Sequence, residues 1–235
     1  MIAPRWLVWT LGVGLLALVL TVPLRVALGA ADLERLNLSA RQVAGTIWDG
    51  RIGDLTLGRQ LLGTFDVWLD PGALLLGRTK LRFDRLDSLQ GPLTGALHTG
   101  GTAGVEELTG RLAIGNLFAP VPVDSIGFED TTILFQGGRC VRADGRLTAT
   151  LAIRLGPLDL ARGFVGKVTC DGERVRARLA SPSGSELVEF YIGQNGRYRG
   201  WLTVRDAPAP VAAALAIYGF RPSAEGLTLS VSNAL

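Results

Sequence analysis

The side chains that could do acid–base or metal chemistry are few and scattered. His98 is the single histidine, so a histidine metal cluster is excluded, and a serine–histidine–aspartate triad would depend on a residue in the glycine-rich stretch 91–104. Glu106 and Glu107 are adjacent and are predicted to point to opposite faces of a strand. The sequence has no G-x-S-x-G, P-loop or H-E-x-x-H motif.

A second acidic pair, Glu129 and Asp130, indicates a turn or a solvated edge. We therefore expect a non-enzymatic protein with no catalytic residue, no cofactor and no bound metal. An enzyme built from carboxylates far apart in the sequence stays open as a minor alternative.

The two cysteines, Cys140 and Cys170, are the only ones in the chain. Their spacing suits no metal site, and a small, even number of cysteines predicts a disulfide in an oxidising compartment. Closing a loop of about 30 residues would stabilise the fold on the order of 3–4 kcal/mol. Two free, buried thiols are the alternative.

The N-terminal segment is strongly apolar. WLVWTLGVGLLALVLTVPLRVAL (6–28) contains one charge, Arg25, and a bilayer core is spanned by roughly 20 apolar residues in a helix. The segment predicts a transmembrane signal anchor over 6–28. Residues 1–5 would be cytoplasmic, 29–42 a juxtamembrane segment, and 43–235 a periplasmic β-sheet domain. A cleavable signal peptide remains the alternative, because Ala27-Leu28-Gly29 offers a small-x-small pattern.

The charge distribution argues against a nucleic-acid partner. The net charge is +3 and the pI about 9.2, but the arginines are spread along the chain without a basic block. Arg174, Arg176 and Arg178 share one face of a predicted strand. This arginine face either meets anionic lipid headgroups or is a solvated face that discourages edge-to-edge aggregation.

Alternating apolar and polar residues dominate the chain after residue 43. RLTATLAIRL (146–155), ERVRARLAS (173–181) and GRYRGWLTVRD (196–206) each place apolar side chains on one face, and short turn signals separate such stretches. The pattern predicts an all-β fold: an N-terminal transmembrane helix, then a large, curved, mainly antiparallel meander sheet with one short C-terminal helix within 207–222.

Two tryptophans stand near predicted turns. In GTIWDGRIGDLTLG (45–58), Asp49-Gly50 is predicted to form a two-residue turn next to Trp48. In GTFDVWLDPG (63–72), Trp68 is predicted to point away from the face shared by its apolar neighbours. Trp48 and Trp68 are therefore the candidate interface residues, because large aromatic side chains near turns are either covered by another element or used in contacts. Burial in the core is the alternative for at least one of them.

Five segments follow the N-terminal anchor in a characteristic order: VAGTIWDGRI (43–52), LLGTFDVWLDPGALLLGRTKLRF (61–83), GGRCVRADGRLTATL (137–151), GKVTCDGERVRARLASPSG (166–184) and NGRYRGWLTVRDAPAPVAAALAIYGF (195–220). In this ordered combination the chain resembles the type II secretion system protein N family (general secretion pathway protein N).

The resemblance implies a component of the machine that moves folded proteins from the periplasm across the outer membrane. It implies a single-pass location in the cell inner membrane, partners among the other secretion components or the exported proteins, and no catalytic residues. The physical alternative is a periplasmic lipid-binding protein, since a curved one-sided sheet can expose an apolar groove for an acyl chain.

Overall fold

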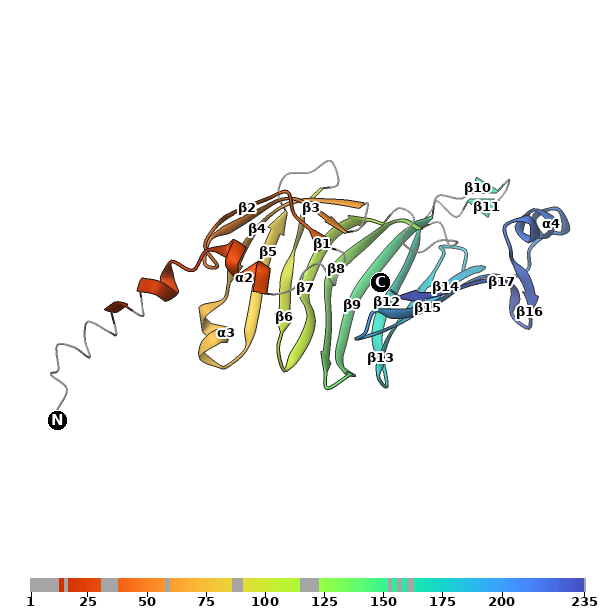
Figure 1. The fold of residues 1–235 in the computed structure, drawn as a ribbon. Helices are drawn as coiled ribbons and strands as arrows, with labels where there is room; N and C mark the ends of the chain where they lie inside the picture. Colours follow the sequence, from red (N-terminus) through yellow and green to blue (C-terminus); the bar gives the residue numbers. More distant parts are fainter. Residues whose placement is uncertain are drawn as a thin grey trace, which may run out of the picture.

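The computed structural model (Figure 1) describes residues 13–14, 17–30, 38–57, 60–85, 91–114, 123–151, 154–155, 158–159 and 163–234. Fifteen strands form one curved sheet in the order β1-β3-β4-β5-β6-β7-β8-β9-β12-β13-β14-β15-β17-β16, with β2 paired to β3. The described pairings are antiparallel and mostly join consecutive strands, so the predicted curved meander is confirmed.

The strands lengthen toward the middle of the sheet. The first eight are β1 (Leu38–Ser39), β2 (Gln42–Gly45), β3 (Gly50–Leu57), β4 (Gln60–Leu69), β5 (Thr79–Arg85), β6 (Leu93–Thr99), β7 (Thr102–Ala113) and β8 (Val123–Gln136). The remaining strands of the sheet are β9 (Arg139–Leu151), β12 (Phe164–Asp171), β13 (Arg174–Ala180), β14 (Glu186–Gly193), β15 (Arg197–Val204), β16 (Arg221–Ser223) and β17 (Gly226–Ala234). A separate hairpin consists of β10 (Arg154–Leu155) and β11 (Leu158–Asp159).

The predicted C-terminal helix is present as α4 (Ala209–Ile217), which begins after Pro208 and buries Val211 and Leu215. A second helix, α3 (Pro71–Leu75), occupies the place where the sequence indicated only a turn. It forms because the Asp70 carboxylate accepts hydrogen bonds from the backbone N–H groups of Gly72 and Ala73, at 2.9 and 3.3 Å.

The N-terminal region has a break between its described helical parts. Residues 17–20 are helical, Pro23 forms an isolated bridge to Thr46, and α2 (Leu24–Ala30) begins directly afterwards. Among the described residues, no helix is long and apolar enough to cross a membrane. Residues 6–12 and 15–16 of the predicted 6–28 span lie outside the described residues.

The alternating pattern sorts side chains onto two faces. We call the face that carries Phe65, Leu147 and Leu202 the inner face, because these residues belong to the two hydrophobic cores, and the opposite side the outer face. One core gathers around β3, β4, β6, β7 and α2, and the other around β8, β9, β12–β15, β17 and α4. Leu112 and Phe128 pack against both cores, so the apolar inner face is continuous.

Bulges in the central strands bend the sheet. Glu107 and Asp130 have positive φ angles of 55° and 47° and lie where the β7–β8 and β8–β9 registers shift. Threonine side chains satisfy the backbone there: the Glu107 N–H donates to Thr132 Oγ1 at 3.2 Å, and the Asp130 N–H donates to Thr109 Oγ1 at 3.1 Å. A bulge bends its strand and increases the local twist, which gives a physical cause for the curvature.

These bulges also correct two predictions about acidic pairs. Glu106 and Glu107 were expected on opposite faces, yet both pair with cations of the outer face of β5, Lys80 and Arg82, because the bulge breaks the two-residue period. Glu129 and Asp130 lie inside the central strand β8 and not in a turn or at an edge of the sheet, so that prediction is wrong.

Candidate functional site

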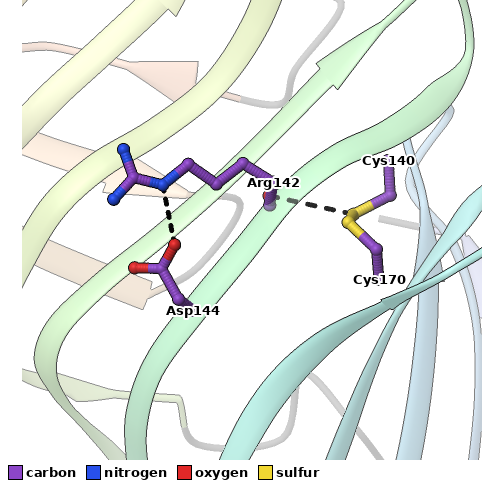
Figure 2. Close-up of a disulfide and its surroundings, with 4 residues drawn as sticks. All are labelled: Cys140, Arg142, Asp144 and Cys170. Carbon is purple, nitrogen blue, oxygen red and sulfur yellow. Dashed lines mark hydrogen bonds and ion pairs between the residues drawn. A yellow bond between two sulfur atoms is a disulfide. The ribbon is translucent and has the colours of Figure 1, made fainter.

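The Cys140–Cys170 disulfide is present and joins β9 to β12 beyond the residues where these two neighbouring strands pair (Figure 2). Strands β9 and β12 pair only where Arg146 to Ala149 face Phe164 to Lys167, and the cysteines lie beyond this pairing, toward the hairpin tips. Their Cα atoms are 5.5 Å apart. Nearby on the outer face of β9, Arg142 donates to Asp144 at 2.7 Å. The disulfide thus holds the β8–β9 hairpin against the β12–β13 hairpin where backbone hydrogen bonds do not.

A hollow of about 900 Å³ opens beside these hairpin tips. We call it the arginine hollow, because Arg174 of β13 and Arg197 and Arg199 of β15 line it. Among the described residues, these three guanidinium groups have no carboxylate within ion-pair distance, and Glu173 is the one carboxylate in the lining. The side chain of Arg174 lies over the Tyr191 ring, 5.9 Å from its centroid.

Hydrogen bonds between turns hold the walls of the arginine hollow. The Gly138 N–H of the β8–β9 turn donates to Gln194 Oε1 of the β14–β15 turn at 2.9 Å. Within the latter turn, the Arg197 N–H donates to Asn195 Oδ1 at 3.1 Å. Hairpins separated by two intervening strands are therefore fixed to each other at this end of the sheet.

The three arginines predicted to form one arginine face have different surroundings in the structure. Arg176 pairs with Glu189 on the neighbouring strand β14, and this hydrogen bond raises the pKa of Arg176. Arg178 is exposed further along β13, and Arg174 joins the arginine hollow instead. The alternating pattern placed Arg197 and Arg199 on the outer face, but their proximity to Arg174 depends on the pairing of β13, β14 and β15.

Trp48 contacts the chain's own N-terminal segment. Its indole N–H donates to the Val19 carbonyl oxygen at 3.0 Å, and the Ile47 N–H donates to the Val22 carbonyl at 3.1 Å. The Ile47 carbonyl in turn accepts from the Leu69 N–H at 2.8 Å. This junction connects the end of the N-terminal helical residues to β4.

The loop next to Trp48 differs from the predicted two-residue turn. Gly45 pairs with Gly50, so the loop spans Thr46–Asp49 and Gly50 opens β3. A Cβ atom on Gly50 would lie 2.6 Å from both the Leu24 side chain and the Thr46 carbonyl oxygen. Gly50 is therefore required by the close approach of Leu24, a long-range contact that the local Asp-Gly signal did not reveal.

Trp68 lies on the outer face of β4, as the alternating pattern predicted, and is 38% exposed. It stands opposite Arg82 in the register. The connection that follows exposes three consecutive leucines, and Leu75 and Leu76 are the most exposed, at 89% and 75%. We call Trp68 and Leu74–Leu76 the apolar corner. Large apolar side chains gathered at a surface mark a contact site more often than single ones do.

His98 and Glu106, which the sequence left as separate candidates, meet on the outer face. His98 Nε2 lies 2.8 Å from Glu106 Oε2, and Lys80 contacts the same carboxylate. The hydrogen bond from Lys80 lowers the pKa of Glu106. A carboxylate that is held ionised by a cation is a weak proton acceptor, so the arrangement supports pairing of charges rather than general base chemistry.

Arg85 was missed by the sequence reasoning. It points to the inner face of β5, is fully buried, and donates to the carbonyl oxygens of Leu62 at 2.7 Å, Gly91 at 3.1 Å and Arg111 at 2.5 Å. Burial lowers its pKa. Its position within the run of inward apolar residues of β5, after Leu81 and Phe83, was the signal available in the sequence.

The inner face provides little free space in the C-terminal half of the sheet. An apolar cavity between β8, β9, β13, β14, β15 and β17 has a volume of about 80 Å³. Pockets that hold small-molecule ligands typically measure about 300–1,000 Å³. The side chains of the inner face therefore largely fill this part of the curved sheet themselves.

Together these features define a curved β-meander protein whose apolar N-terminal segment is joined to the sheet through Trp48. No cluster of potential metal ligands occurs in the described part of the chain. The family model of type II secretion system (T2SS), protein N matches residues 36–230. The chain belongs to this family and is a component of the type II secretion system, as the resemblance implied. Searches of curated proteins and of solved structures returned no match.

Proposed function

We propose that the protein is a non-enzymatic, inner-membrane-anchored periplasmic component of the type II secretion system that supports export of folded proteins across the outer membrane. The family match over residues 36–230 carries this proposal. The described residues support a binding or scaffold role, because their most prominent features are a filled apolar core, a charged outer face and an exposed apolar corner.

In this proposal the apolar segment 6–28 anchors the chain in the inner membrane. Its end contacts the sheet, since Pro23 bridges to Thr46 and Leu24 is buried in the N-terminal core, so the membrane-embedded part precedes Pro23. Residues 1–5 remain in the cytoplasm, 29–42 form the juxtamembrane segment, and 43–235 lie in the periplasm. The apolar composition of 6–28 supports the anchor, and a disulfide suits an oxidising compartment. The Trp48 junction would then fix the sheet close to the membrane surface.

The proposed partners are other secretion components or the exported proteins, and the apolar corner is the surface that best suits a protein contact. Trp68 combines an exposed aromatic ring with neighbouring charged residues, and Leu75 and Leu76 offer apolar area. Trp48 has a different role in this proposal, because its indole N–H is already used within the chain.

The acyl-chain alternative finds less support. The cavity of about 80 Å³ in the C-terminal half of the inner face is smaller than the about 300–1,000 Å³ of typical small-molecule sites. We therefore do not propose lipid storage in the inner face as a second function.

The test is the distribution of secreted proteins between medium and periplasm in a strain that lacks the gene. We expect folded exoproteins to remain in the periplasm, and the intact chain to restore their release. A chain carrying Trp68→Ala and Leu75→Ser should fold and restore release poorly, whereas Val165→Ala is the matched control, because Val165 is 50% exposed on the same face at a distant strand, β12. Unchanged secretion in the deletion strain would refute the proposed role.

A further inference from the structure

We propose that the arginine hollow is a binding site for a phosphate group, either as a free phosphate compound or as part of an anionic phospholipid headgroup. This inference does not depend on the secretion function. It rests on three guanidinium groups that have no carboxylate partner in the described part of the chain and that line one hollow beside a single carboxylate.

Several arginines elsewhere on the outer face are ion-paired, whereas the three arginines that line this one hollow have no carboxylate partner among the described residues. Arg51 pairs with Asp66 at 2.6 Å, Arg142 with Asp144 at 2.7 Å, and Arg176 with Glu189. At the hollow, Arg174, Arg197 and Arg199 contribute three positive charges and Glu173 one negative charge, which leaves a local excess of two. A phosphate monoester, with a charge of about −1.5 to −2 at neutral pH, matches this excess.

The geometry favours a phosphate over a carboxylate. Arg174 comes from β13, while Arg197 and Arg199 come from β15, and strand β14 lies between them. On β14, Tyr191 and Gly193 line the hollow between these two strands, and Asn195 Oδ1 lies beside Gly193, where a Cβ atom would approach it to 3.1 Å. A phosphate presents acceptor oxygens in several directions and can meet guanidinium groups from two sides, whereas a carboxylate offers two oxygens in one plane.

The hollow is also preorganised. The Gly138–Gln194 hydrogen bond and the Arg197–Asn195 hydrogen bond fix its turns, and Cys140, two residues after Gly138, is held by the disulfide. These contacts fix the backbone of the turns, so a ligand has to order only the three exposed arginine side chains when it binds. The volume of about 900 Å³ exceeds that of a phosphate ion and leaves room for the remainder of a ligand.

The experiment titrates inorganic phosphate into the full chain in nonionic detergent at low ionic strength, followed by isothermal titration calorimetry. We expect saturable binding that weakens at least tenfold in the Arg174→Gln/Arg199→Gln double variant. Arg178→Gln is the matched control, since it removes an exposed arginine of the same strand outside the hollow, and it should leave the affinity unchanged. Glu173→Gln should tighten binding several-fold, a gain that a misfolded variant would not show.

Two further ligands identify the source of the phosphate. A water-soluble, short-chain phosphatidic acid, whose headgroup is a phosphate monoester, would assign the site to a lipid headgroup if it binds at least tenfold more tightly than inorganic phosphate. Equal affinities would assign the site to free phosphate compounds. Three results would overturn the proposal: no saturable phosphate binding, equal affinities of the double variant and the Arg178→Gln control, or tighter binding of acetate than of phosphate.

Discussion

Removal of the Cys140–Cys170 disulfide is expected to destabilise the sheet by about 3–4 kcal/mol. The two cysteines are 30 residues apart in sequence, and closure of a loop of this length removes that much conformational free energy from the unfolded chain. In a domain of about 200 residues, each kcal/mol shifts the melting temperature by about 2–4 °C. We therefore expect a decrease in Tm of roughly 10 °C.

The structure indicates that the full effect should be seen. The Cα–Cα distance of 5.5 Å lies within the usual range for disulfides, so the backbone need not distort to form the bond. Strands β9 and β12 pair only over Arg146–Ala149 and Phe164–Lys167. Without the disulfide, no backbone hydrogen bond between these two strands replaces it at the described hairpin tips.

The assay is thermal unfolding of the full chain in detergent, followed by circular dichroism, for the wild type and for Cys140→Ser/Cys170→Ser. Reductant should lower the Tm of the wild type to that of the double variant and should leave the double variant unchanged. The reasoning would be refuted by a double variant that melts within about 2 °C of the oxidised wild type. It would equally be refuted if reductant lowered both melting temperatures by the same amount.

Three other perturbations test separate contacts. Trp48→Phe keeps an aromatic ring but removes the indole N–H and part of the ring area, so denaturant unfolding should show a loss of at least about 1 kcal/mol in the free energy of unfolding; no loss would mean that the indole hydrogen bond does not stabilise the junction. Leu215→Ala in α4, at a fully buried site, should cost about 2–5 kcal/mol, while Ile217→Ala, 86% exposed, should stay within about 0.5 kcal/mol. Lys80 lowers the pKa of Glu106, so the ionised Glu106 carboxylate stabilises the fold at pH values above the ordinary glutamate pKa. This contribution is lost as the pH falls through the lower pKa of the folded state. Glu106→Gln should therefore flatten the acid limb of a curve of stability against pH, and an unchanged limb would contradict the pairing of Lys80 with Glu106.

The faces of regular strands could be predicted from the sequence because the side-chain period of a strand is two. In β13, Val175, Ala177 and Leu179 are buried while Arg174 and Arg178 are exposed, as the alternation indicated. The short C-terminal helix could also be predicted, since its prolines and apolar spacing are local signals. These features depend on neighbouring residues in the chain and not on which strand lies alongside.

The bulges and the arginine hollow could not be predicted, because they depend on contacts between segments far apart in the sequence. The bulge at Glu107 is stabilised by Thr132, and the bulge at Asp130 by Thr109, so neither is encoded in one strand alone. Likewise the arginine hollow needs β13 and β15 to flank β14, and a linear pattern does not specify how closely their side chains approach. Sequence periodicity therefore identified the outer arginines but not the site that they form.

The edges of the sheet suggest where partners bind. A long open sheet exposes unpaired backbone groups at its outermost strands, which invite addition of another strand. Here β16 is only three residues long and contains Pro222, which has no N–H to donate, next to the charged Arg221. At the other end, β1 and β2 are short and together cover β3. The edge at β3 is covered, but β16 pairs only with Gly226–Thr228 of β17, so the remaining residues of β17 have no strand on their outer side in the described part of the sheet. We therefore expect this stretch of β17 to be the edge open to strand addition, and the apolar corner to be the surface for side-chain contacts.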